Sequence, residues 1–113
     1  MLVYKILTYS EWEEANNSNH FDGSVLDQMD GFIHLSTQEQ VANTLAIHFK
    51  GQDKLILLSF KAEYLENLKW EKSRDGLLFP HLYDKLPMQE YQNYWLLTVN
   101  EEGIPLSPWT ETK

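Results

Sequence analysis

Along much of the chain, hydrophobic residues alternate with polar ones at the period of two that is typical of a β-strand. Three segments show this alternation: residues 2–7, 68–72 and 93–99. In the second of them, Leu68 and Trp70 are expected to face inward. The run 54–60 is almost continuously apolar instead, which indicates a central strand that is covered on both faces.

Two segments carry the signals of helices. Ser10 and Glu13 have the spacing of a capping box, which predicts a short helix after them. Ser36 and Glu39 repeat this spacing, and the apolar positions that follow recur every three or four residues. This pattern predicts a longer, amphipathic helix over residues 37–49.

A short apolar segment, residues 32–35, directly precedes the second helix and predicts a buried strand. His34 lies at its end, where unpaired backbone N–H groups and the positive end of the helix dipole are available to an anion. The segment 20–30 has no clear period, so we expect a loop with one helical turn after Ser24. His34 is therefore a candidate site residue, and the structural alternative is a core histidine bonded to a backbone carbonyl.

The segment 77–83 is mostly apolar but contains Pro80. Proline cannot donate to a β-ladder, so we expect an edge or loop segment here and not a central strand. His81 and Tyr83 are two residues apart, so their side chains point to one side of an extended chain. Together with His34 they predict a ligand pocket, and the alternative is that His81 and Tyr83 cover a sheet edge.

Arg74 is the only arginine of the chain and lies in a turn that begins at Ser73. In an acidic chain its guanidinium is suited to clamp a phosphate or a carboxylate, with the Ser73 hydroxyl as a further contact. The alternative is a solvated turn residue paired with Asp75. Glu71, on the outer face of its strand, is a candidate catalytic carboxylate. No pair of histidines has the spacing of a zinc motif, so we expect no metal site.

Strands and helices mix irregularly over 113 residues, which predicts one compact α+β domain with mixed, mostly antiparallel sheets and flanking helices. We expect its core over residues 2–99 and a loosely held tail over 100–113. The net charge of -8 argues against non-specific binding to nucleic acids. The chain contains no cysteine, no basic apolar leader and no apolar run near the ~20 residues of a membrane span, which favours a cytoplasmic protein.

Three stretches carry a resemblance to a known family: Gly31–Thr37, Trp70–Glu71 and Phe79–Tyr83. They resemble the signature of a small bacterial family, domain of unknown function 952, and the likeness runs over about residues 4–99. The resemblance implies a fold similar to that of the ADP-ribosyltransferases. That wider group includes NAD-cleaving toxins and tRNA 2'-phosphotransferases.

In that group a histidine holds the adenosine-side ribose of NAD, aromatic residues lie against nicotinamide, and a glutamate often lies near the last strand. The resemblance therefore implies that His34 takes the histidine role, Tyr83 an aromatic role and Glu90 that of the acid. A shared fold does not by itself imply a shared reaction.

Two functions are open at this point. The first is a transferase, of the ADP-ribosyl or phosphoryl kind, that acts on NAD or an ADP-ribose-like nucleotide, with NAD as substrate. Its catalytic candidates are His34, Glu71 and Glu90. The second is a non-catalytic domain that binds a small anionic ligand or a protein partner through the same pocket. In both cases the candidate ligand contacts are His34, Ser36, Ser73, Arg74, His81 and Tyr83.

Overall fold

The computed structural model describes residues 1–73 and 76–109, and its largest sheet has three antiparallel strands. Their order is β1 (Leu2–Thr8), β4 (Leu55–Lys61) and β8 (Tyr91–Leu96). Strand β4 lies in the middle and is buried along nearly its whole length, which confirms the central strand predicted from its apolar run.

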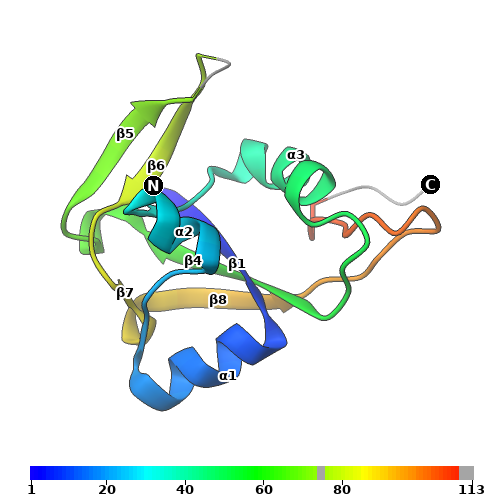
Figure 1. Cartoon of the computed structure of the whole chain (residues 1–113), viewed down its shortest axis with the longest axis horizontal. Coiled ribbons are helices and arrows are strands. Elements are labelled where there is room, and N and C mark those ends of the chain that lie inside the picture. The colour runs from blue at the N-terminus through cyan, green and yellow to red at the C-terminus, as the bar shows by residue number, and fades with distance from the viewer. Residues whose placement is uncertain (74–75, 110–113) are drawn as a thin grey trace.

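A second antiparallel sheet has the order β3 (Ile33–His34), β6 (Leu78–Leu82) and β5 (Leu68–Lys72). The hairpin of β5 and β6 extends away from the rest of the molecule (Figure 1). The short strands β2 (His20–Phe21) and β7 (Leu86–Pro87) form a third, two-stranded sheet. The chain is thus an α+β domain with mainly antiparallel sheets.

Strand β6 is the centre of the second sheet, so the prediction of an edge or loop segment around Pro80 was wrong. The backbone N–H of Leu35 donates to the carbonyl of Pro80 at 3.0 Å. In an antiparallel strand the N–H and C=O of one residue point the same way, so the N–H that proline lacks would also have pointed toward Leu35. Leu35 lies just beyond the two-residue strand β3, and the missing donor therefore falls where the ladder ends.

Three helices flank the sheets: α1 (Tyr9–Ser18), α2 (Val25–Asp30) and α3 (Gln38–His48). Two short 3-10 turns, Ala62–Tyr64 and Met88–Glu90, complete the regular structure of the described residues. Helix α2 occupies the segment for which the sequence predicted a loop with one helical turn.

Helix α2 begins after Ser24, as expected, but α1 and α3 begin at other residues than the predicted caps. Thr8 caps α1, because its hydroxyl accepts from the N–H of Glu11 and the Glu11 carboxylate accepts from the N–H of Thr8. Helix α3 begins after Thr37, whose N–H donates to the side chain of Gln40. Ser36 instead exchanges two backbone hydrogen bonds with Tyr4 of β1. Near each true cap lies a second Ser or Thr that is also three residues before an acid or amide. The capping-box pattern therefore fits both residues, and the prediction chose the wrong one.

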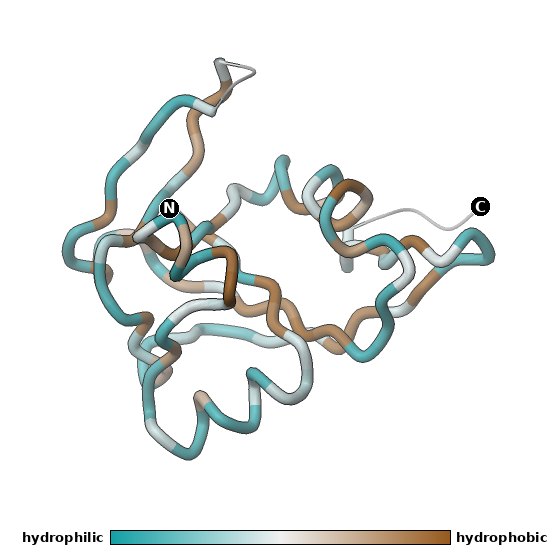
Figure 2. The backbone as a smooth tube through the Cα atoms, in the orientation of Figure 1, coloured by the Kyte–Doolittle hydropathy of each residue, from teal (hydrophilic) through white to brown (hydrophobic). Residues whose placement is uncertain are grey.

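The alternation along β1 divides the interior into two cores. Val3 and Leu7 point to the face that also receives α1 and the second sheet. Tyr4 and Ile6 point to the opposite face, where α3 contributes Val41 and its neighbour Leu45 to the core. Hydrophobic positions accordingly lie mainly in the strands that cross the middle of the molecule, while α1 is mostly hydrophilic (Figure 2).

Two further expectations differ from the structure. Trp70 is 38% exposed, because the second sheet is covered on that face only toward its base, where Leu82 is buried. The segment after β8 folds back on the sheet: Val99 bridges Pro105, and the N–H of Leu106 donates to the carbonyl of Thr98. The described part of the tail is therefore held by backbone hydrogen bonds.

Candidate functional site

Strand pairing brings the two candidate histidines together. His34 of β3 lies directly opposite His81 of β6, and the preceding pair in the register is Ile33 with Leu82. Because side chains alternate between the faces of a sheet, the apolar pair enters the core and the histidine pair lies on the other face. The two imidazole centroids are 5.6 Å apart.

Phe32 joins these histidines and Tyr83 into one group of rings, here called the ring cluster. The Phe32 ring stacks on His81 with centroids 4.1 Å apart, and it lies 4.7 Å from His34 and 5.3 Å from Tyr83. Tyr83 is 40% exposed and both histidines are partly exposed, so the cluster forms a surface that a ligand can reach. The structure thus brings together three of the residues that the sequence proposed.

Asp27 holds His34 from the interior. The carboxylate is 2% exposed, and its Oδ1 lies 2.6 Å from Nδ1 of His34 and accepts from the His34 backbone N–H at 3.1 Å. Its Oδ2 accepts from Nζ of Lys5 and from the N–H of Ser24, both at 2.9 Å. Four donors therefore converge on one buried carboxylate, which fixes the position of the imidazole.

Lys5 is buried because it lies on the face of β1 that packs into the larger core. Its neighbours on the same face, Val3 and Leu7, are fully buried in the larger core. A lysine ammonium in such a place needs partners. Nζ donates to Asp27 and, at 3.0 Å, to the backbone carbonyl of His34, so Lys5 contacts both members of the pair.

The environment of Asp27 keeps it ionised. Burial by itself raises the pKa of a carboxyl, but the hydrogen bond with His34, the charge and hydrogen bond of Lys5 and the N–H of Ser24 outweigh it. The pKa of Asp27 is therefore well below its usual range. Gly23 makes room for this carboxylate, since a Cβ built there would lie 2.9 Å from the Cβ of Asp27.

The outer ring nitrogen of His34 meets a second carboxylate. Nε2 lies 2.9 Å from Oδ2 of Asp30, whose side chain is 43% exposed. Asp27 and Asp30 are both carried by α2, one on its buried and one on its exposed side. Helix α2 ends at Gly31, which adopts φ 85° and donates its N–H to the carbonyl of Asp27. This turn leads the chain directly into Phe32 and β3.

A second carboxylate–imidazole pair lies beside the first. Oε1 of Glu71 accepts from the hydroxyl of Tyr83 at 2.6 Å and lies 2.9 Å from Nδ1 of His81. Two hydrogen bonds lower the pKa of Glu71, the larger effect coming from Tyr83 and the smaller from His81. The hydrogen bond between Tyr83 and Glu71 also raises the pKa of Tyr83. Nζ of Lys69 lies 5.0 Å from the centroid of the Tyr83 ring.

Ser36, Ser73 and Glu90 make no hydrogen bond with the ring cluster in the described part of the chain. The hydroxyl of Ser36 is buried and lies 3.3 Å from that of Thr44. Glu90 interacts with Gln92 through its backbone carbonyl and with no residue of the ring cluster in the described part of the chain. Ser73 begins the turn of the β5–β6 hairpin, and its buried hydroxyl has no partner among the described residues. Arg74 lies outside the described residues.

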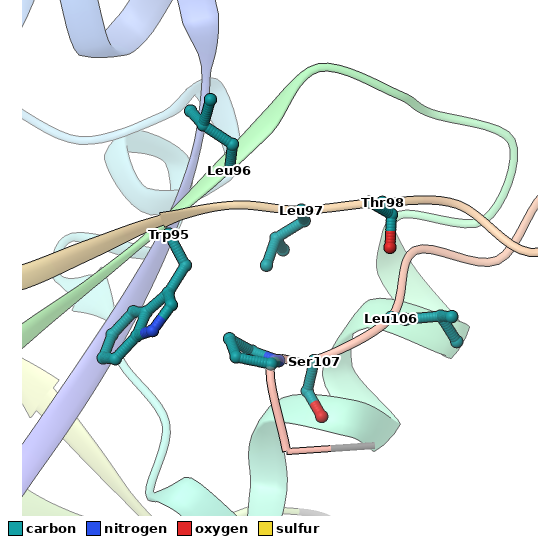
Figure 3. A pocket seen from close by; sticks show the side chains of 7 residues that line it. Trp95, Leu96, Leu97, Thr98, Leu106 and Ser107 are labelled. Carbon is teal, nitrogen blue, oxygen red and sulfur yellow. The ribbon is translucent and has the colours of Figure 1, made fainter. Parts of the chain in front are cut away.

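Two shallow pockets lie elsewhere on the surface. One, of about 280 Å³, is lined by residues of α1, β2, α2 and the segment between β2 and α2, among them His20 and Asp22. The other, of about 190 Å³, lies between the end of β8 and the segment that folds back on it, with Trp95 and Ser107 in its wall (Figure 3). Neither is lined by a residue of the ring cluster.

The sequence prediction missed Lys5, Asp27, Asp30 and Phe32 as parts of this site. A signal for two of them was present. The alternation of β1 places Lys5 between two apolar residues on one face, which calls for a buried acidic partner. Asp27 follows Ser24 with the spacing of a capping box, the arrangement that the structure shows at the start of α2. Pairing the two requires the tertiary fold.

The described residues contain no helix that is long and apolar enough to cross a membrane. In residues 1–73 and 76–109, no group of three or more His, Asp or Glu side chains is arranged to hold a metal ion.

Comparisons with known proteins place the chain in a family. Among curated proteins, no relative matches it. The crystal structure of protein CC0527 from Caulobacter crescentus is 47% identical, covers 94% of each chain and superposes with a TM-score of 0.91. The solution structure of CC0527 is 48% identical over 92% of this chain and 90% of that one, with a TM-score of 0.82. The model of the family described as protein of unknown function DUF952 matches residues 6–102, and the chain therefore belongs to the DUF952 family.

Proposed function

We propose that the ring cluster binds the ribosyl part of an NAD- or ADP-ribose-like nucleotide. The observation that carries this proposal is the convergence of two carboxylate-backed imidazoles and two aromatic rings on one partly exposed face. Phe32 and Tyr83 offer apolar ring faces to the flat parts of a ligand. His34 and His81 offer polar ring atoms to hydroxyl groups.

The charges at the cluster favour a sugar over a phosphate as the group in contact. Asp30 and Glu71 both expose carboxylate oxygens there. Of the nearby lysines, Lys5 is engaged with Asp27, and Lys69 lies over the ring of Tyr83. An anion held directly at this face would be repelled, whereas a hydroxyl can donate to a carboxylate.

The phosphates of the ligand would then contact residues outside the ring cluster. Arg74 as a phosphate clamp stays a prediction from the sequence.

For a transferase, Glu71 is better suited as a charged group than as an acid. Its lowered pKa keeps it ionised near neutral pH. Cleavage of the bond between ribose C1' and the nicotinamide nitrogen leaves the electron pair on nicotinamide and positive charge on the ribose ring. An ionised Glu71 near that ring would stabilise this charge.

The test is titration calorimetry with NAD, ADP-ribose, AMP, ribose 5-phosphate and nicotinamide. We expect ADP-ribose or NAD to bind and nicotinamide alone to bind more weakly. His34→Ala should reduce the affinity about tenfold, which corresponds to one lost hydrogen bond of about 1.4 kcal/mol. His48→Ala is the matched control, because His48 is an exposed residue of α3 away from the cluster. Equal affinities of the two variants, or no binding of any ribosyl compound, would reject the proposal.

The second candidate is a domain that binds such a ligand without cleaving it. What favours it is that Oε1 of Glu71 already accepts from Tyr83 and pairs with His81, while Glu90 lies apart from the cluster. Release of nicotinamide from NAD distinguishes the two. A transferase or NAD-cleaving activity should be lost in Glu71→Gln, whereas a binding domain releases no nicotinamide even as wild type.

A further inference from the structure

We propose that Asp27 is a positioning residue that holds a proton on Nδ1 of His34, and that Asp30 is a contact residue that selects a sugar hydroxyl beside Nε2. This inference rests on the proposed function for the identity of the ligand. The positioning of His34 by Asp27 does not depend on it.

The geometry around Asp27 fixes one ring proton, the one on Nδ1 of His34. An ionised carboxylate only accepts hydrogen bonds, so the 2.6 Å contact between its Oδ1 and Nδ1 of His34 requires a proton on Nδ1. The other oxygen is occupied by Lys5 and by the N–H of Ser24. Lys5 also donates to the carbonyl of His34, which ties the backbone of the histidine to the same anchor. The ring therefore cannot turn without breaking a buried network.

With Nδ1 held inside, Nε2 lies on the exposed side next to Asp30. A sugar hydroxyl has one proton to donate and lone pairs that accept, so it can donate to the Asp30 carboxylate while it accepts from a protonated Nε2, or it can donate to an unprotonated Nε2. A phosphate oxygen at the same place can only accept and would lie against the charge of Asp30. The pair of His34 and Asp30 is thus suited to a ribose hydroxyl and unfavourable to a phosphate.

Substituting Asp27 by asparagine gives a sharp test of the first part. Asparagine has one oxygen, and we expect it to face the charged Lys5 ammonium and the Ser24 N–H, so that the His34 backbone N–H loses its acceptor. The amide NH₂ group would then face His34 and donate to Nδ1, which moves the ring proton to Nε2. A structural role of Asp27 without effect on the tautomer would not produce this exchange.

The measurement is a two-bond proton–nitrogen correlation spectrum of the imidazole rings at pH 8, above the ordinary histidine pKa of about 6.5. In the wild type we expect a proton on Nδ1 of His34, and in Asp27→Asn a proton on Nε2 alone. His48 of the same samples serves as internal reference, and Asp22→Asn, an exposed acid outside the network, as the matched variant.

A wild-type His34 with exchanging tautomers, or with a proton on Nε2 alone, would overturn the positioning role. An unchanged ring in a folded Asp27→Asn would do the same. If Asp27→Asn does not fold, the wild-type spectrum decides.

The second part is tested by calorimetry with ADP-ribose. Asp30→Asn should keep the Nδ1 proton of His34 but bind ADP-ribose about tenfold more weakly, while Asp22→Asn binds as the wild type. Unchanged affinity in Asp30→Asn would overturn the contact role. If the wild type binds no ribosyl compound, the proposed function and the role of Asp30 both fail, while the spectra still decide the role of Asp27.

Discussion

Two histidines on neighbouring strands each pair with a carboxylate through Nδ1, but the two pairs differ in their surroundings. Asp27 is buried, accepts from four donors and is matched by a buried lysine. Glu71 is exposed to solvent and holds His81 and Tyr83 through one oxygen. The first pair is part of the core, whereas the second lies on its surface.

This difference separates a contribution to folding from a contribution to binding. A buried ion that loses its partner is costly, because water cannot replace the lost interactions. An exposed pair is screened, and its partners regain hydrogen bonds to water when it is broken. We infer that the Asp27 pair couples the position of His34 to the stability of the whole domain, and that the Glu71 pair can be changed with little effect on the fold.

The largest expected effect is therefore that of Asp27→Ala. The substitution leaves the Lys5 ammonium buried without its counter-ion and should lower the free energy of unfolding by about 3–5 kcal/mol. Urea unfolding followed by circular dichroism measures this change. Asp22→Ala, at an exposed acid, is the control and should unfold at nearly the wild-type midpoint. A loss below about 1 kcal/mol in Asp27→Ala would show that the network is not held in the core.

The pH dependence of stability gives a second, smaller contrast. The pKa of Asp27 is lower in the folded than in the unfolded state, so its contribution is fully present above the unfolded value of about 3.9. The contribution is lost as the pH falls below that value, because the unfolded state then binds the proton first. The unfolding free energy of wild type should fall more steeply below about pH 4 than that of Asp27→Asn. Parallel curves would contradict this expectation.

Local patterns predicted the elements of the fold but not their partners. The alternation of β1 and the apolar run of β4 were sufficient to predict two strands of the main sheet, and the structure buries both strands on both faces. The prediction of an edge or loop segment at Pro80 was wrong because the cost of the missing N–H depends on where the neighbouring strand ends, and no local pattern contains that information. Trp70 misled because an alternating strand also occurs in a hairpin that is only partly covered.

The candidate site was predicted in part for the same reason. His34 and His81 were recognised one by one, each from its own segment, and the β3–β6 register brings them face to face. Lys5 and Asp27 are 22 residues apart and read as an ordinary strand lysine and helix-cap acid. Their pairing arises only when β1 and α2 meet at the same core, so it could not be predicted from either segment.

The smallest expected effect concerns the exposed pair. Tyr83→Phe keeps the aromatic ring, which lies 5.3 Å from Phe32, and removes only the hydroxyl that donates to Glu71. Because this hydrogen bond is the largest cause of the lowered pKa of Glu71, that pKa should rise toward its ordinary value of about 4.3. A titration of the side-chain carboxyl carbon by nuclear magnetic resonance measures it, with Tyr64→Phe as the control at an exposed tyrosine.

The thermal midpoint of Tyr83→Phe should stay at that of the wild type, since both partners of the broken bond are exposed. A shifted midpoint together with an unshifted Glu71 would reverse the comparison and assign the exposed pair a structural role. A shifted pKa at unchanged stability would instead show that Tyr83 sets the pKa of Glu71, the carboxylate proposed to act on the ligand. The exposed pair would then be the part of the site in which chemistry can be altered separately from folding.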